Sequence, residues 1–265
     1  MISNNKIFYK CLGYKNTKNI KKPIFFFHVP KCAGTTFAVL ISHLLKTAHR
    51  INGALFKNND KGGLTAYENY LKNEKLINNN KLDFLYGHVP FEIYNKLKKE
   101  YLFVTTLREP IERCVSHYNW GINRGYYSIK ESLEDLFIKN MIPKNAIVNQ
   151  FSGIGLSNPN NKKSIDLSFN NLKNKIDLIY DSKEISYLLN LIISKYNLPN
   201  LFFQKQQVNL NKNEISEKNL NIIKNYNELD LILYKKLFEN NIINNKNINH
   251  EKRTVQKYLY SSPEI

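Results

Sequence analysis

The chain contains few cysteines and few glycines for its length. Its 265 residues include three Cys, ten Gly and a single Trp. Three cysteines at positions 11, 32 and 114 cannot supply a disulfide framework, so we expect reduced thiols and a reducing compartment. The chain also lacks a Cys/His cluster with the spacing of a zinc site, and no metal site is predicted.

Long apolar runs are missing as well. No stretch reaches the ~18 apolar residues that suggest a membrane-spanning helix. Residues 1–22 are polar and basic, and they lack the apolar segment of about 7–15 residues that a signal peptide carries. We therefore expect no membrane span and a cytoplasmic location.

Acidic residues are scarce relative to basic ones. The sequence has 22 Asp and Glu against 39 Lys and Arg, which gives a formal net charge of +17. Such a field attracts anions. The lysines are spread along the whole chain, however, and no zinc finger, aromatic RNA-binding pattern or basic zipper is present. The charge is therefore a weak guide to partners, and no nucleic-acid partner is expected.

The most informative stretch is an apolar run followed by a short loop with one lysine. Ile24–Phe27 predicts a short buried strand, and Phe37–Leu45 predicts a largely buried helix after the loop. Backbone N–H groups at a helix start point into such a loop, and the helix dipole favours negative charge there. The pattern of strand, small-residue loop and helix therefore predicts an anion-binding site.

Individual residues of this loop suit a phosphate group. Gly34 lets the backbone approach an anion closely, Lys31 adds a positive charge, and one of two threonines can cap the helix. The loop is not a Walker A sequence, because its lysine precedes its only glycine. An ordinary strand–turn–helix whose threonine is only a cap stays an alternative. The candidate ligand-binding residues are Pro30, Lys31, Cys32, Ala33, Gly34, Thr35 and Thr36.

A second segment carries an arginine at a similar position. Tyr101–Thr106 predicts a strand, and Pro110 suits the first turn of the helix that follows. Arg108 lies between them, where ligands bind in open α/β sheets. Its guanidinium can bind a terminal phosphate at two points, and Ser116 could donate a further hydrogen bond. Alternatively, Arg108 pairs with Glu109 or Glu112 and Ser116 is a neutral surface residue.

A third segment ends in a histidine. The stretch that begins at Asp83 predicts a strand that ends in Gly87 and His88. An unperturbed imidazole titrates near pH ~6.5 and is largely neutral at pH 7, so His88 could accept a proton. It could also be a structural histidine bonded to the backbone. His28, beside the loop, fits strand-end packing or loop support better.

Together the three segments resemble the sulfotransferase superfamily, whose sulfate donor is 3′-phosphoadenosine 5′-phosphosulfate (PAPS). The loop with Lys31 resembles the family's 5′-phosphosulfate loop, and the stretch from Arg108 to Ser116 resembles its 3′-phosphate motif. The Gly-His-Val segment is similar to that of the heparan sulfate 2-O-sulfotransferase group, in which the histidine is the proposed catalytic base. Glu109 departs from the aspartate that is usual in the family.

The resemblance implies an α/β class with a P-loop-like three-layer fold, in which helices flank a central parallel sheet. It implies transfer of a sulfuryl group from PAPS to an acceptor hydroxyl, expected on a carbohydrate, with adenosine 3′,5′-bisphosphate as product. His88 would be the general base, and Lys31 would stabilise the leaving phosphate. Alternatives stay open: a nucleotide kinase or other phosphotransferase, or a basic non-catalytic polyanion-binding protein. A lipid, a peptide tyrosine or a small metabolite stays open as the acceptor.

The resemblance and the composition together divide the chain into three parts. We expect a basic lead-in over residues 1–22, a sulfotransferase domain over residues 23–240 and a basic, Asn-rich tail over residues 241–265. Within the domain, Ser216–Phe238 predicts one long helix. Residues 47–82 are predicted to be in part a loop or an acceptor-side insertion.

Overall fold

A five-stranded parallel sheet forms the centre of the computed structural model. The structure describes residues 9–10, 19–51, 66–78, 81–128, 130–153, 162–199, 202–203 and 215–243. The strands lie in the order β3–β4–β2–β5–β6. Their bounds are β2 Ile24–Phe27, β3 Ala48–Ile51, β4 Phe84–Gly87, β5 Leu102–Leu107 and β6 Leu178–Asp181. A separate antiparallel pair joins β1 (Tyr9–Lys10) to β7 (Phe202–Phe203).

The strand order places the first strand of this sheet in its middle. After β2 the chain forms β3 and β4 on one side, and then crosses over to form β5 and β6 on the other. Phe27 at the end of β2 is therefore in register with Gly87 of β4 and with Thr105 of β5. The carboxyl ends of β4, β2 and β5 are neighbours at the point where the strand order reverses. In open α/β sheets this is where ligands bind.

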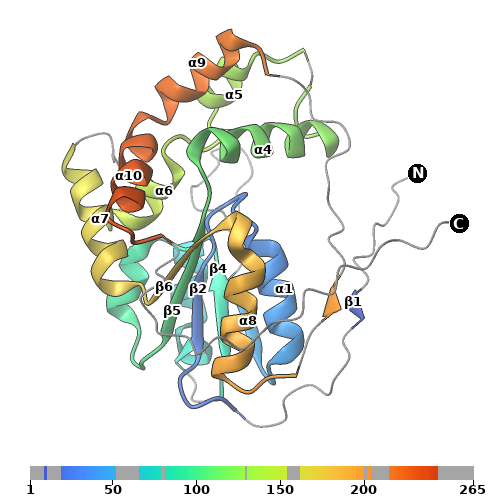
Figure 1. Ribbon diagram of the computed structural model, residues 1–265, viewed down its shortest axis with the longest axis vertical. Coiled ribbons are helices and arrows are strands. Elements are labelled where there is room, and N and C mark those ends of the chain that lie inside the picture. The colour runs from blue at the N-terminus through green and yellow to red at the C-terminus, as the bar shows by residue number, and fades with distance from the viewer. Residues whose placement is uncertain are drawn as a thin grey trace, which may run out of the picture.

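Helices cover both faces of the sheet, and the predicted α/β fold is confirmed. One face packs against α1 (Gly34–Leu44) and α8 (Ile185–Lys195). The other packs against η1 (Phe91–Lys96), α6 (Ala146–Phe151), α7 (Lys162–Lys175) and α10 (Glu228–Glu239). Figure 1 shows these two layers on either side of the strands. Alternate side chains of β2 face opposite layers and all are buried, as in parallel sheets covered on both sides.

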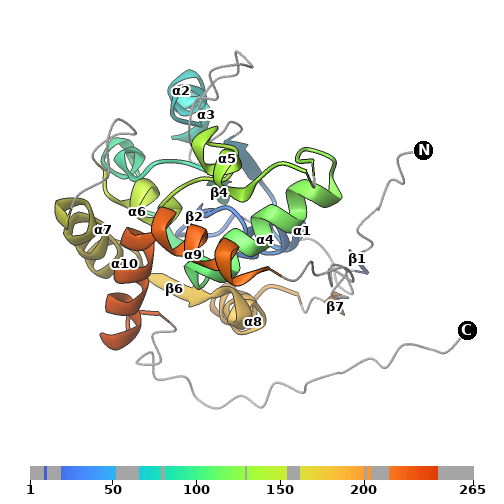
Figure 2. The same ribbon diagram turned by 90° about the horizontal axis from the view of Figure 1, so that it is seen from above.

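A third group of helices lies beyond the carboxyl ends of the strands. It contains α4 (Pro110–Asn123), α5 (Leu133–Ile138) and α9 (Glu217–Tyr226), packed around Cys114, Phe137 and Ile223. Figures 1 and 2 show α4 above the sheet. The other described helices are α2 (Ala66–Lys72), α3 (Glu74–Ile77) and η2 (Ser182–Glu184). Of the helices described, none is long and apolar enough to cross a membrane.

The prediction of one long helix from Ser216 to Phe238 is wrong. The helix is interrupted at Asn227, which separates α9 from α10. The Asn227 side chain is buried, donates to the Ile223 carbonyl at 2.9 Å and accepts from the Asn145 N–H at 3.2 Å. The group that donates to the amide oxygen lies 82 residues away in sequence, so the helical periodicity of the flanking residues did not reveal the break.

The segment over residues 47–82 contains more structure than was predicted. It includes β3, α2 and α3, while residues 52–65 and 79–80 lie outside the described part. Most of the predicted lead-in and tail also lies outside it, so the division of the chain into three parts stays a prediction.

Candidate functional site

The three predicted segments meet at neighbouring strand ends. The lysine-containing loop follows β2, His88 follows β4, and Arg108 follows β5. Hydrogen bonds hold the loop from both sides. The His28 N–H donates to the Gly87 carbonyl at 3.0 Å, and the Thr106 hydroxyl donates to the Cys32 carbonyl at 2.6 Å. The loop is therefore fixed between the strands that carry the other two segments.

The loop between β2 and α1 has an unusual backbone. Lys31 and Ala33 both have positive φ angles, 67° and 59°, a region that residues with side chains rarely adopt. The first backbone hydrogen bond of α1 runs from Phe37 to Ala33. The N–H groups of Gly34, Thr35 and Thr36 therefore precede the helical ladder, and such groups can bind an anion.

Gly34 is required by the packing inside the protein. A Cβ atom at this position would lie 2.1 Å from Cδ2 of His28. The His28 ring is buried, and it lies close to the rings of Phe26 and His88, at centroid distances of 5.6 Å and 4.2 Å. His28 thus supports the loop, as its position in the sequence suggested.

Two loop residues differ from their expected roles. The predicted threonine cap of α1 is wrong, because the N-cap residue is Ala33 and no side chain caps the helix. The Cys32 thiol is fully buried, which raises its pKa to about 12, and the Cys32 N–H donates to the Val29 carbonyl at 3.3 Å. Cys32 can therefore shape the loop, but it offers neither a thiolate nor a free N–H to a ligand.

Lys31 lies within a cationic part of the site. Its ammonium is 4.9 Å from the centroid of the Trp120 ring, which belongs to α4. Burial, and after it the nearby charges of Arg108 and Arg124, together lower the pKa of Lys31 to about 8. An anion bound among these three cations would relieve their repulsion.

Arg108 follows β5 directly, and Pro110 occupies the first turn of α4 as predicted. The Arg108 guanidinium lies 3.4 Å from the Glu112 carboxylate, which also binds the Lys183 ammonium at 2.7 Å. The alternative pairing with Glu112 is therefore present. The Arg108 side chain is 32% exposed, and an ion pair of this kind contributes little stability, so a phosphate could replace Glu112. Ser116 is half-buried in the same helix.

His88 is held in a defined tautomer. Its Nδ1 lies 2.8 Å from the His28 carbonyl oxygen. A carbonyl can only accept, so Nδ1 carries the proton and Nε2 keeps a free lone pair. Burial lowers the pKa of His88, and Arg50 lowers it further, against the opposing effect of the bond to His28. His88 is therefore a neutral imidazole at pH 7 whose Nε2 can accept a proton.

Sequence reasoning missed a buried network that places α4, α6 and α10. Arg113 of α4 is fully buried and donates to the Asn227 side chain at 3.1 Å. Asp230 of α10 accepts from the N–H groups of Ile147 and Val148 at 3.1 and 2.8 Å, at the start of α6. These partners lie about 80 or more residues apart in sequence, so no local pattern indicates them.

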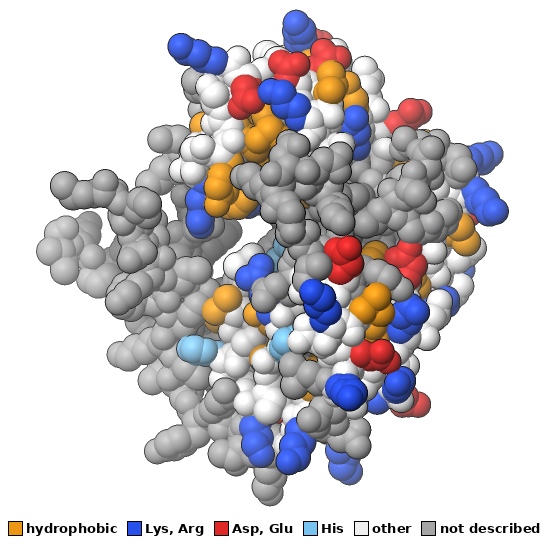
Figure 3. All heavy atoms as spheres, turned by 180° about the vertical axis from the view of Figure 1, so that it is seen from behind, with side chains coloured by type: hydrophobic (Ala, Val, Ile, Leu, Met, Phe, Trp, Pro, Cys, Tyr) orange, Lys and Arg blue, Asp and Glu red, His pale blue; other side chains and the backbone are white. Residues whose placement is uncertain are grey.

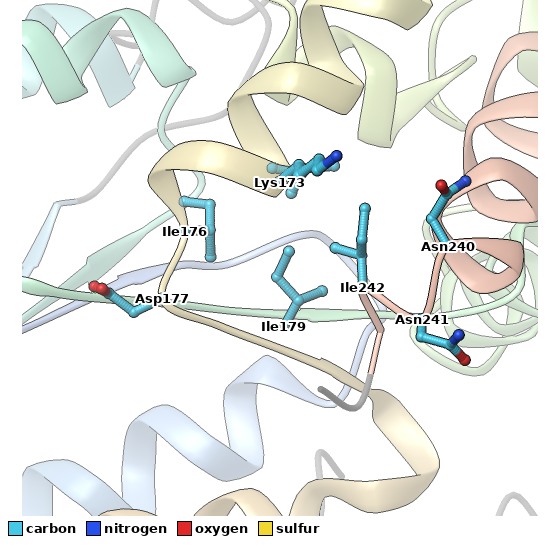
Figure 4. Close-up of a pocket in the computed structure, with 8 residues that line it drawn as sticks. Lys173, Ile176, Asp177, Ile179, Asn240, Asn241 and Ile242 are labelled. Carbon is cyan, nitrogen blue, oxygen red and sulfur yellow. The ribbon is translucent and has the colours of Figure 1, made fainter. Parts of the chain in front are cut away.

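A pocket of about 360 Å³ lies away from the motif residues. It is at the edge strand β6, between the ends of α7 and α10 (Figure 4). Its lining residues are Leu172, Lys173, Ile176, Asp177, Ile179, Asn240, Asn241 and Ile242. Across the described ranges, no group of three His, Cys, Asp or Glu side chains could hold a metal ion.

Comparison with known proteins identifies the family. A family model described as "Sulfotransferase family" matches residues 18–190, which include all three segments. The chain belongs to the sulfotransferase family. The resemblance inferred from Lys31, His88 and Arg108 is thereby confirmed at the level of the family.

Individual relatives of this sulfotransferase match it over a shorter stretch. Heparan sulfate 2-O-sulfotransferase 1 of Xenopus laevis is 32% identical over 99 residues, which is 36% of this chain and 28% of the relative. The proteins of the same name from Cricetulus griseus and Mus musculus are 31% identical over 99 residues, with the same coverage. The match spans little more than a quarter of the length of these curated relatives.

Proposed function

We propose that this sulfotransferase transfers a sulfuryl group from PAPS to a hydroxyl group of a carbohydrate. The observation that carries the proposal is the meeting of two cationic segments and one neutral histidine at three adjacent strand ends. Lys31 and Arg108 supply the positive charge, and His88 has a free Nε2 beside them. An anionic donor and a weak hydroxyl nucleophile require these chemical groups.

The residues present fit the donor. Lys31 and the N–H groups ahead of α1 would hold the 5′-phosphosulfate, and Arg108 and Ser116 would hold the 3′-phosphate. Burial and, after it, repulsion by Arg108 and Arg124 lower the pKa of Lys31. Binding of an anion at this position removes that repulsion, which supports a ligand with several negative charges. When bound, PAPS supplies an activated sulfuryl group on a phosphate leaving group.

His88 would act on the acceptor. Its Nε2 would take the proton of the acceptor hydroxyl while that oxygen bonds to sulfur. The imidazolium that results keeps its Nδ1–H bond to the His28 carbonyl, which stabilises the new charge. Lys31 would stabilise the negative charge that develops on the phosphate oxygen as its bond to sulfur breaks.

The names of the relatives support a carbohydrate acceptor, since those that match are heparan sulfate 2-O-sulfotransferases. The net charge of +17 would attract an acidic glycan, but it does not by itself select an acceptor. Figure 3 shows Lys and Arg side chains spread over one face with Asp and Glu among them, so the charge on that face is not gathered into one patch.

A binding comparison tests the donor. Thermal unfolding is measured with adenosine 3′,5′-bisphosphate and, separately, with ATP and Mg²⁺. We expect a rise in Tm with the bisphosphate and little change with ATP. The opposite pattern would favour a nucleotide kinase. A panel of glycans, a tyrosine peptide, a lipid alcohol and a phenol, assayed with radiolabelled PAPS, then identifies the acceptor class.

A further inference from the structure

A buried glutamine joins two of the strand ends at the site. The His28 N–H donates to the Gly87 carbonyl, and beyond this bond lie the carbonyl of His28 itself and that of Val89, two residues after Gly87. Both accept from the side-chain amide of Gln150, which lies on α6. The distances from Nε2 are 3.0 Å to Val89 O and 3.4 Å to His28 O. The amide therefore bridges the ends of β2 and β4.

One of these carbonyls is also the partner of His88. The His28 oxygen accepts from His88 Nδ1 at 2.8 Å and from Gln150 at 3.4 Å. A carbonyl oxygen has two lone pairs, so it can serve both donors. The other carbonyl belongs to Val89, the residue directly after His88. Gln150 thus holds the His28 carbonyl, which fixes the His88 ring, and also the Val89 carbonyl, which belongs to the backbone beside His88.

The burial of Gln150 argues against a role in packing alone. Its side chain is fully buried, and its Oε1 has no hydrogen-bond partner among the residues that the structure describes. An unpaired buried amide oxygen reduces stability, and an apolar side chain of similar size would avoid this cost. What an apolar side chain could not supply is the pair of N–H donors that face the two carbonyls.

The helix that carries Gln150 is itself held in place. Asp230 accepts from two N–H groups in its first turn, and the Ser168 hydroxyl donates to the Val148 carbonyl at 3.1 Å. The position of the amide is therefore set by rigid elements and not by a loop.

We propose that Gln150 is a positioning residue for His88, which keeps the ring protonated on Nδ1 and its Nε2 free. The inference rests on the proposed function only in so far as His88 is the base. Among the described residues, the titratable and charged groups that act on His88 are His28, Arg50 and His117. Gln150 is neutral, so its effect on His88 comes from geometry and not from charge.

The test uses the full chain without donor or acceptor. Nitrogen-15 NMR of labelled histidine, with His88 assigned from a His88→Asn variant, reports the tautomer. Gln150→Met removes both donors at similar length. Asn149→Ala is the matched control, because Asn149 is the adjacent amide on α6, has an unpaired buried oxygen and donates from its side chain to the Lys144 carbonyl, away from His88. We expect a uniform Nδ1–H tautomer in the wild type and the control, and a mixture in Gln150→Met.

Kinetics provide a second readout. Gln150→Met should lower kcat by about tenfold or more with little change in the KM for PAPS, since a misplaced base slows the reaction without weakening donor binding. The shorter amide in Gln150→Asn should have an intermediate effect. A Gln150→Met protein with a lower Tm, an unchanged His88 tautomer and an unchanged kcat would show that Gln150 is only structural.

A measurement on the wild type avoids any failure of the variants to fold. Scalar couplings across hydrogen bonds should join the Gln150 side-chain nitrogen to the carbonyl carbons of His28 and Val89, and their absence would overturn the proposal. The tautomer and the couplings need no turnover. If His88→Ala remains fully active, His88 is not the general base. The tautomer and the couplings still decide whether Gln150 positions the His88 ring.

Discussion

The ammonium of Lys31 lies 4.9 Å from the centroid of the Trp120 ring. This cation–π contact joins the loop after β2 to helix α4, which begins just after Arg108. Within the described ranges Lys31 forms no ion pair, and the charged side chains that most affect it, Arg108 and Arg124, are both cationic. The aromatic ring therefore holds Lys31 at the site without neutralising it.

The lowered pKa of Lys31 predicts an alkaline limit to activity. The pKa is about 8 in the free protein, so the fraction of protonated Lys31 falls as the pH rises through that value. If Lys31 must carry a charge, kcat/KM for PAPS should fall above about pH 8, because this parameter reports the free enzyme. A pH profile of Lys31→Arg is the control. Arginine stays charged, so in that variant the alkaline fall of kcat/KM should move to higher pH. A fall at the same pH as in the wild type would show that a group other than Lys31 titrates.

Arg108 should determine much of the affinity for a 3′-phosphate. Arg108→Ala is expected to weaken binding of adenosine 3′,5′-bisphosphate by about 2 kcal/mol, or roughly thirtyfold, because a charged partner of the phosphate is lost. Isothermal titration calorimetry measures the change. Glu112→Gln is the control, since it removes the competing carboxylate and keeps the guanidinium. Its affinity should be equal or higher, and equal affinity in Arg108→Ala would reject the assignment.

The contact between Gly34 and His28 should be visible in a double-mutant cycle. Gly34→Ala places a Cβ 2.1 Å from the His28 ring, and overpacking of this kind costs about 1–3 kcal/mol. His28→Ala opens the space, so Gly34→Ala should cost much less in that background. Urea unfolding of the four proteins gives the coupling free energy. If the losses of unfolding free energy in the two single variants simply add in the double variant, the predicted contact between residue 34 and the His28 ring would be contradicted.

The sequence was sufficient to predict the three strands that carry the site, although it did not reveal the edge strand β3. Ile24–Phe27 is apolar and bounded by polar residues, so its strand could be recognised from the pattern alone. Arg108 and His88 could be placed at strand ends for the same reason. The order of the strands was not predicted, since apolar runs carry no information about their neighbours.

The contacts that fix the site could not be predicted in this way. Gln150 and His28 are 122 residues apart, and Arg113 and Asn227 are 114 apart. Nothing in their local sequence distinguishes a bridging amide from an ordinary polar residue of a helix. The break at Asn227 and the left-handed backbone at Lys31 and Ala33 have the same origin, because each depends on groups that only the fold brings together.

The most direct test of the proposed reaction is the transfer of radiolabelled sulfate from PAPS to a glycan by the wild type and by His88→Ala, with binding of adenosine 3′,5′-bisphosphate measured for both. We expect a labelled product whose sulfate maps to a hydroxyl. In His88→Ala we expect a rate lower by about a hundredfold or more with nearly unchanged binding, because the loss of a general base removes a contribution of this size. Full activity of His88→Ala, or absence of transfer to every acceptor, would contradict the proposed reaction.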